Sequence, residues 1–196
     1  MEKKLKNIGF AITGSFCTHE KILDEVQNLV NKGYNIYPIL SENSAEIDTR
    51  FGTANEFLKK LEAITKHKPF TTIVEVEPTG PQNMFDIIVV APCTGNTLAK
   101  MANGINDTAV TMAVKAHLRN NKPVVIGIST NDALGLNFKN IATLLNTKNI
   151  YFVPFGQDDF KNKPKSLVAN WDKLHETILE AYTGTQIQPL LLKENK

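Results

Sequence analysis

Residues 86–102 read DIIVVAPCTGNTLAKMA, an apolar run that ends in a turn of small and hydroxylated residues and continues into a helical pattern. The run from Asp86 to Ala91 is nearly continuous in Val and Ile rather than alternating, which is typical of a strand covered on both faces. Pro92 has no amide hydrogen, so we expect it to stop the strand ladder and turn the chain. This strand-turn-helix unit favours a parallel sheet between two layers of helices.

Five further strand-like runs occur along the chain, with helical patterns between most of them. The six predicted strands are Asn7–Thr13, Tyr34–Leu40, Ile73–Val76, Asp86–Ala91, Pro123–Ser129 and Ile150–Val153. Alternation of strands and helices implies βαβ units with right-handed crossovers. We therefore predict an α/β fold, a three-layer sandwich around a mostly parallel, flavodoxin-like (Rossmann-like) sheet.

The helices are indicated by caps and apolar faces. Thr53 and Glu56 have the spacing of a capping box, and Asp107 is expected to cap a helix with His117 on its apolar face. The last helix is expected to start near Val168 and to stop near Gly184. We assign residues 1–184 to a single flavoprotein-like domain and 185–196 to a C-terminal tail, whose apolar stretch predicts packing on a neighbouring protomer.

Composition and charge exclude several classes of function. The 22 basic and 20 acidic residues leave a formal net charge of +2, which provides no footprint for nucleic acid or an anionic membrane. No apolar run approaches the roughly 18 residues of a membrane span, and no signal-peptide pattern is present, so we expect a cytoplasmic protein. The spacing of Cys17 and Cys93 is not that of metal ligands, so we expect no metal site, and we expect no disulfide framework from two distant cysteines.

Three turns at predicted strand ends carry the candidate chemistry, because ligands of open parallel sheets bind at the carboxyl ends of strands. The turn Thr13–Thr18 offers a glycine, hydroxyls and a helix N-terminus, which suit a phosphate as well as they suit a simple tight turn. The turn after Ala91 holds more polar groups than a helix cap needs, which favours a ligand site. The turn 127–135 alone is consistent with an ordinary Asn-Asp turn.

These segments resemble known families. Residues 91–107, APCTGNTLAKMANGIND, resemble the Pro-Ala-Ser-Ala-Asn-Thr motif of the homo-oligomeric flavin-containing cysteine decarboxylases, and ITGS at 12–15 is similar to their flavin-phosphate loop. Over essentially the whole chain the sequence resembles more closely the family of dipicolinate synthase B subunits. The segments that carry this likeness are GFAITGSFCT (9–18), TRFG (49–52), APCTGNT (91–97), RNNKPVVIGISTNDALGLN (119–137) and FVPFGQDD (152–159).

The resemblance implies flavin mononucleotide (FMN) at the strand ends, often between the protomers of a trimer or a larger homo-oligomer. Carried over, the phosphate loop falls on Thr13, Gly14 and Ser15, with a second hydroxyl at Ser41. Asn96 would face the reacting ligand as a catalytic residue. The residues implied around the isoalloxazine ring are Pro92, Cys93, Thr94, Gly95 and Thr97.

Two departures from the decarboxylase pattern disfavour a cysteine decarboxylase. The active-site His of that family precedes the strand that leads into the motif, where this chain has no His in the stretch Glu75–Pro81. The Pro-x-Met-Asn substrate clamp is replaced by residues 127–131, GISTN. FMN binding is compatible with both changes, and Gly95 in place of Ala alters the shape of the flavin pocket.

Two charged or titratable side chains complete the candidate site. His19 lies beside the first turn and could donate to a phosphate or carry a proton, or it could be only a residue of the first helical turn. Arg50 offers the planar fork that a carboxylate of a dipicolinate precursor needs. The polar residues of the third turn, Ser129, Thr130 and Asn131, are expected to contact the same substrate.

By resemblance, the chain is expected to be one component of a two-component oxidoreductase. With the A subunit of dipicolinate synthase, which would carry NADP, it would oxidise dihydrodipicolinate to dipicolinate during sporulation. One alternative is a catalytically silent, flavin-binding or scaffold component that completes the pocket of the A subunit. A further alternative is a flavin-dependent cysteine decarboxylase.

Overall fold

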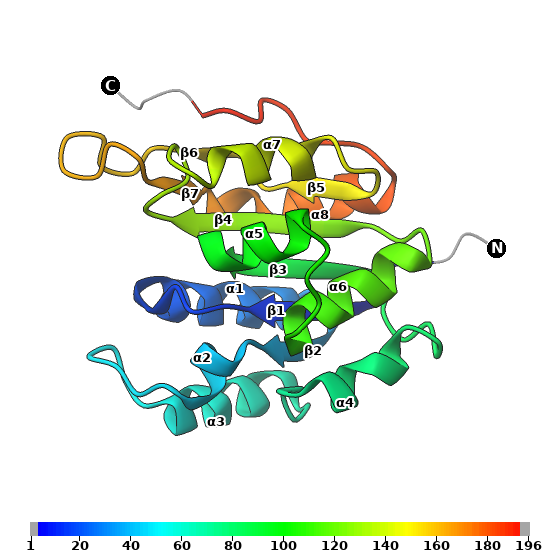
Figure 1. Cartoon of the computed structure of the whole chain (residues 1–196). Helices are drawn as coiled ribbons and strands as arrows, with labels where there is room; N and C mark the ends of the chain where they lie inside the picture. Colours follow the sequence, from blue (N-terminus) through cyan, green and yellow to red (C-terminus); the bar gives the residue numbers. More distant parts are fainter. Residues whose placement is uncertain (1–3, 193–196) are drawn as a thin grey trace.

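Seven strands within residues 4–192, the part of the chain that the computed structural model describes, form one sheet (Figure 1). The strand order is β2-β1-β3-β4-β7-β6, and β5 also pairs with β4. The strands are β1 (Asn7–Ile12), β2 (Asn35–Leu40), β3 (Ile87–Cys93), β4 (Val124–Thr130), β5 (Ile150–Phe152), β6 (Phe155–Gly156) and β7 (Leu167–Ala169).

The first five strands are parallel and follow the order 2-1-3-4-5 of flavodoxin-like sheets. This confirms the predicted mostly parallel, flavodoxin-like α/β fold. The far end of β4 then pairs antiparallel with β7, where Ser129 is opposite Val168, and β7 pairs antiparallel with β6. The β6–β7 hairpin therefore extends the sheet at the carboxyl end of β4.

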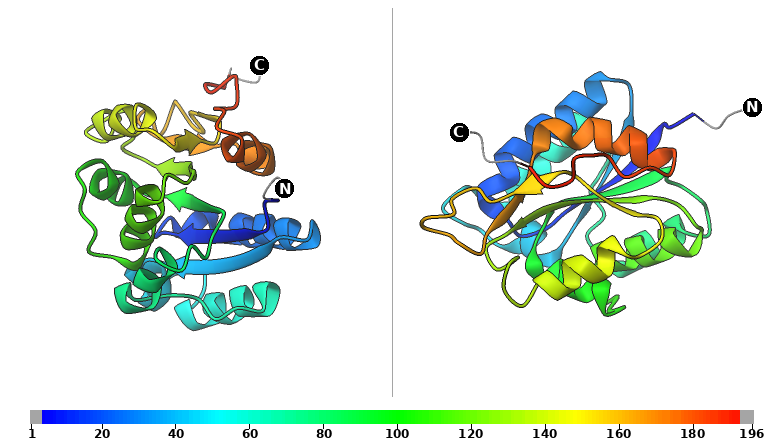
Figure 2. Two further views of the ribbon diagram at one scale, coloured as in Figure 1. Left: turned by 90° about the vertical axis from the view of Figure 1, so that its right-hand side faces the viewer. Right: turned by 90° about the horizontal axis from the view of Figure 1, so that it is seen from above.

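Helices cover both faces of the sheet (Figure 2). Helices α1 (His19–Asn31), α3 (Ala54–Thr65) and α8 (Leu174–Tyr182) pack on one face. The other face carries α4 (Ile73–Val76), α5 (Gly95–Ala102), α6 (Ala109–Arg119) and α7 (Phe138–Leu145). The short helix α2 (Glu42–Glu46) directly follows β2.

The strand residues alternate between the two cores. Val89 and Val125 face α1, α3 and α8, whereas Val90 and Ile126 face the opposite helix layer. All four side chains are fully buried. Because both faces of β3 and β4 are covered, these strands read as continuous apolar runs, and each such side chain contributes about 1.5–3 kcal/mol through burial.

The predicted strand Ile73–Val76 is wrong, since these residues form the short helix α4. The hydroxyl of Thr72 accepts from the amide of Glu75 at 3.3 Å, and the Glu75 carboxylate accepts from the amide of Thr72 at 3.1 Å. This capping box nucleates a helical turn. Val74 is 82% exposed and only Val76 enters the core, so the apolar run does not form a two-sided strand.

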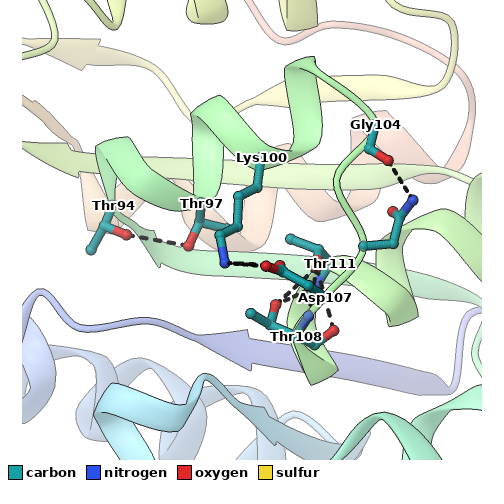
Figure 3. Close-up of polar contacts among 8 residues, drawn as sticks. Thr94, Thr97, Lys100, Gly104, Asp107, Thr108 and Thr111 are labelled. Atoms are coloured by element: carbon teal, nitrogen blue, oxygen red, sulfur yellow. Dashed lines mark hydrogen bonds and ion pairs between the residues drawn. The ribbon is translucent and has the colours of Figure 1, made fainter.

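Two helix starts also differ from the prediction. Val168 belongs to β7, and α8 begins at Leu174 after a 3-10 turn over Trp171–Lys173, because Asn170 caps that turn instead. Thr108, rather than Asp107, caps α6. Asp107 instead pairs with Lys100 at 2.8 Å (Figure 3). The capping box of Thr53 and Glu56 and the buried position of His117 are confirmed.

Strand β3 does not stop at Pro92 as expected but continues to Cys93. The peptide bond between Ala91 and Pro92 is cis, and the pairing of β3 with β4 shifts register between Val90 and Cys93. The proline carbonyl still accepts from the amide of Thr13 at 3.3 Å, so the missing amide hydrogen does not end the strand. The irregularity is a bulge rather than a stop.

The described part of the tail pairs with its own chain. The amide of Phe155 donates to the carbonyl of Leu190, and the amide of Leu192 donates to the carbonyl of Phe155, both at 3.0 Å. Packing of the tail on a neighbouring protomer stays a prediction, and residues 193–196 lie outside the described residues. No helix within residues 4–192 is long and apolar enough to cross a membrane.

Candidate functional site

An open cleft of about 660 Å³ lies at the carboxyl ends of β1, β3 and β4. Its volume falls within the roughly 300–1,000 Å³ of small-molecule sites. The cleft is lined by Gly14–Thr18 after β1, Arg50 and Phe51 between α2 and α3, Thr94 after β3, Ser129–Asn131 at the end of β4, and Asp158, Lys163, Ser166 and Val168 of the β6–β7 hairpin. The carboxyl ends of the parallel strands all lie at this edge of the sheet, which is why segments distant in sequence meet here.

Three hydroxyls form a mutually hydrogen-bonded group, the hydroxyl triad of Ser15, Thr18 and Ser129. The oxygen of Ser15 lies 2.8 Å from that of Ser129 and 3.2 Å from that of Thr18, and Thr18 lies 3.1 Å from Ser129. The amide of Gly14 donates to no acceptor within the described chain. Hydroxyls and a backbone amide at a helix entry are groups that bind phosphate oxygens.

Thr13 links the first two turns from beneath the cleft. Its hydroxyl donates to the carbonyl of Pro92 at 2.7 Å and accepts from the amide of Thr94 at 3.0 Å. The side chain is 1% exposed and does not line the cleft. Thr13 therefore holds the turn after β1 against the turn after β3.

Most of the residues at the end of β3 and in the turn after it that were predicted to contact the flavin do not line the cleft. The hydroxyl of Thr94 lies 3.2 Å from that of Thr97 rather than capping an amide of α5 (Figure 3). Pro92 and Cys93 are buried, and burial raises the pKa of the Cys93 thiol. Asn96 is exposed at the first turn of α5. Only Thr94 of these residues lines the cleft itself.

Gly95 is the contact point between α5 and the loop after β4. A Cβ atom at Gly95 would lie 2.5 Å from Nδ2 of Asn137 and 2.6 Å from Oδ1 of Asp132. The Asp132 carboxylate accepts from the hydroxyl of Thr130 at 2.6 Å and from the side-chain amide of Asn137 at 2.7 Å. A carboxylate is stabilised beside a helix N-terminus, and here the glycine provides the space that it needs.

Two further predicted site residues, Ser41 and His19, do not line the cleft. Ser41 caps α2, where its hydroxyl accepts from the amide of Ser44 at 3.4 Å. His19 is 8% exposed; its Nε2 lies 3.1 Å from the carbonyl oxygen of Thr13, and its ring stacks on Phe57 with centroids 4.3 Å apart. Burial lowers the pKa of His19, which favours the neutral ring. Its ring lines a smaller neighbouring cavity of about 180 Å³.

Arg50 brings a cation to the cleft. Its guanidinium carbon lies 4.9 Å from the ring centroid of Phe51. No carboxylate in the described part of the chain pairs with Arg50, which is itself exposed. A guanidinium without an acidic partner at a polar cleft is suited to binding an anion from solution.

The structure adds Thr18, which lies in the predicted turn but was given no role of its own, and three residues that the sequence did not indicate. Thr18 completes the hydroxyl triad, and Asp158, Lys163 and Ser166 arrive from the hairpin between β6 and β7. In sequence this hairpin is a loose polar segment, and only the pairing of β7 with the end of β4 places it at the cleft. The only local feature of the sequence that pointed to this group was the abundance of hydroxyl side chains in the turn that ends at Thr18.

Comparison with known proteins agrees with this fold. The Flavoprotein family model matches residues 1–182. The B subunit of dipicolinate synthase from Bacillus subtilis (strain 168) is 48% identical over 190 residues, which cover 97% of this chain and 95% of that protein. The chain belongs to the family of dipicolinate synthase B subunits.

One solved structure supports the assignment to this family, and a second shares the fold. The crystal structure of the dipicolinate synthase B subunit from Bacillus halodurans superposes with a TM-score of 0.88 at 47% identity, covering 96% of each chain. DmrB from Burkholderia xenovorans, solved in complex with FMN, superposes with a TM-score of 0.67 at 20% identity, covering 92% of this chain and 97% of DmrB, and shares the fold. Family members are components of an enzyme, and a B subunit implies an A subunit for its partner.

Proposed function

We propose that this chain acts with the A subunit of dipicolinate synthase in an oxidoreductase that converts dihydrodipicolinate to dipicolinate during sporulation. The observation that carries the proposal is the cleft, which combines the hydroxyl triad with an Arg50 that has no acidic partner in the described chain. Aromatisation of the ring removes two hydrogens, one as a hydride and one as a proton. A cofactor must accept the hydride, because protein side chains do not.

FMN fits the groups that line the cleft. The Gly14 amide and the hydroxyl triad are suited to its phosphate, and Thr94 and the exposed Asn96 lie at the turn where its ring would lie. Bound FMN would supply hydride acceptance. NADP on the A subunit is the alternative acceptor. The remaining residues predicted around the flavin are buried. They would support the pocket wall rather than contact the flavin through exposed side chains, and they are Thr13, Pro92, Cys93, Gly95 and Thr97.

The substrate side of the proposal rests on Arg50 and the end of β4. A guanidinium can bind one carboxylate of dihydrodipicolinate through two parallel hydrogen bonds. Ser129, Thr130 and Asn131 line the same cleft and offer hydroxyl and amide groups for the rest of the ligand. We include a homo-oligomer, a trimer or larger, in the proposal, since Phe51 at the cleft and Leu191 of the tail are 55% and 67% exposed.

Titration of the purified chain with FMN, followed by flavin absorbance and fluorescence, tests the cofactor. Wild type should bind saturably, and Ser15→Asp should lose binding because its carboxylate would repel the phosphate. Thr185→Asp introduces the same charge at an exposed position outside the cleft and should bind like wild type. Binding by Ser15→Asp as tight as by wild type would place the phosphate away from Ser15, and no binding by wild type would remove FMN from the proposal.

A catalytically silent scaffold is the second candidate. The observation that favours it is the burial of His19 against Phe57, which leaves no histidine among the described residues that line the cleft. Assay of the isolated A subunit decides between the two. Full dipicolinate formation without this chain would support the scaffold, and activity only in the presence of this chain, lost in Arg50→Ala, would support the proposed catalytic role.

A further inference from the structure

Two cations reach the cleft from opposite ends of the strand order. Arg50 follows β2 through the loop between α2 and α3, and Lys163 lies in the hairpin between β6 and β7. Figure 1 shows these two loops, cyan and orange, at the same end of the molecule with the turn after β1 between them. A ligand in the cleft would therefore have one cation on each side.

We propose that Lys163 is the second cation of a dicarboxylate site, opposite Arg50. In the absence of ligand, the Asp158 carboxylate pairs with the Lys163 ammonium, and a carboxylate of the ligand replaces it on binding. The inference rests on the proposed function and deepens it, because it names a residue that distinguishes a dicarboxylate from a monocarboxylate. Arg50 binds the first carboxylate and Lys163 the second.

The contacts of Lys163 leave its side chain available for such an exchange. Its backbone is held on both sides: its amide donates to the carbonyl of Asp159 at 2.7 Å, and its carbonyl accepts from the amide of Ser166 at 3.0 Å. Its ammonium lies 3.6 Å from Asp158, with side chains 58% and 35% exposed. An ion pair this exposed contributes little stability, so replacement of Asp158 by another carboxylate costs little.

Asp158 is not needed to form the hairpin turn. Asp159 performs that role, since its carboxylate accepts from the amide of Asn162 at 3.0 Å and from the Asn162 side chain. Gln157 also bridges the hairpin by donating to the carbonyl of Pro164 at 2.8 Å. The position of Lys163 is therefore set without Asp158.

The charges around the cleft match a dianion. Among the described residues that line it, Arg50 and Lys163 are the cations and Asp158 is the carboxylate. A monocarboxylate can form an ion pair with Arg50 while Lys163 remains paired with Asp158. A dicarboxylate gains both cations, because its second charge competes with Asp158 for the same ammonium.

The test compares dipicolinate with pyridine-2-carboxylate in metal-free buffer, on the full chain and on its complex with the A subunit. Binding is read from protection of Cys17 against a thiol reagent, since Cys17 is exposed in the cleft and Cys93 is buried. Lys163→Gln should weaken dipicolinate binding roughly tenfold and leave the monocarboxylate unchanged. Asp158→Asn should tighten dipicolinate binding, because it removes the competing carboxylate.

Lys161→Gln is the matched control, with the same charge change in the same hairpin. Lys161 lies 5.9 Å from the Phe160 ring centroid and does not line the cleft, so dipicolinate affinity should be unchanged. The inference is overturned if Lys163→Gln changes neither ligand, or both equally, while Arg50→Gln still weakens binding. If wild type and the complex bind neither compound, the proposed substrate site falls as well.

Discussion

The hydroxyl oxygens of Ser15 and Ser129 lie 2.8 Å apart, although 114 residues separate them in sequence. Ser15 follows β1 and Ser129 belongs to the end of β4, and β3 lies between these two strands in the sheet. The contact therefore spans the carboxyl end of β3 and joins two of the three polar turns. It is the structural reason to treat those turns as one site.

Ser15 and Ser129 should be energetically coupled. Ser15→Ala and Ser129→Ala each remove one hydroxyl of the pair, so the double variant should be less destabilised than the sum of the single variants by about 0.5–1.5 kcal/mol. Urea unfolding of the four proteins measures this coupling. The pair Ser15 and Thr183, whose hydroxyl bonds within its own helix end, is the control and should be additive. Additive effects for Ser15 and Ser129 would contradict the observed contact.

Acid should destabilise the protein through His117. Burial lowers the pKa of His117 from 6.5 to about 3, and its Nε2 has no hydrogen-bond partner in the described chain. In the unfolded chain His117 is protonated as the pH falls below about 6.5, whereas in the folded chain it stays neutral until about pH 3. The free energy of unfolding is therefore retained above pH 6.5 and decreases as the pH falls towards 3.

Replacing His117 by Leu should therefore flatten the pH dependence of stability. Between pH 6.5 and 5 the wild type should lose about 1.5 kcal/mol more of its free energy of unfolding than His117→Leu, since one pKa unit corresponds to about 1.4 kcal/mol. Denaturant unfolding at a series of pH values gives both curves. Parallel curves would mean that His117 has the same pKa in the folded and the unfolded chain.

Gly95→Ala should be destabilising because of a steric conflict with Asp132. The added methyl would approach Oδ1 of Asp132 to 2.6 Å, and such overpacking costs about 1–3 kcal/mol. The combination Gly95→Ala with Asp132→Ala should be more stable than the sum of the two single effects predicts, because the contact with Asp132 is removed and only those with Nδ2 of Asn137 at 2.5 Å and Oγ1 of Thr130 at 2.9 Å remain. Thermal unfolding of the three variants measures this. A tolerated Gly95→Ala would show that the loop after β4 is free to move away from α5.

Gly127→Ala should displace the indole ring of Trp171. A Cβ atom at Gly127 would lie 2.6 Å from Cζ3 of Trp171, which packs over β4. Trp171 is the single tryptophan of the sequence, so its fluorescence reports this site alone. We expect a red-shifted emission maximum and a loss of about 1–3 kcal/mol in stability. An unchanged emission maximum would contradict the close packing.

Much of the fold could be predicted from local pattern. The Val and Ile run in β3 indicated a strand covered on both faces, and the spacing of Thr53 and Glu56 marked the start of α3. The strand predicted at Ile73–Val76 failed because four apolar and acidic residues do not distinguish a strand from a helical turn. There the neighbouring Thr72 decided the outcome through its capping contacts.

For the site, the sequence by itself determined the chemistry of each turn: the glycine and hydroxyls after β1, the polar residues after β3 and β4, and the cation Arg50. Only the tertiary structure decided which of them meet. His19 does not line the cleft, since its ring stacks on Phe57 of α3, and Lys163 reaches the cleft because β7 pairs with the end of β4. Both depend on long-range packing between elements, which no local spacing of residues encodes.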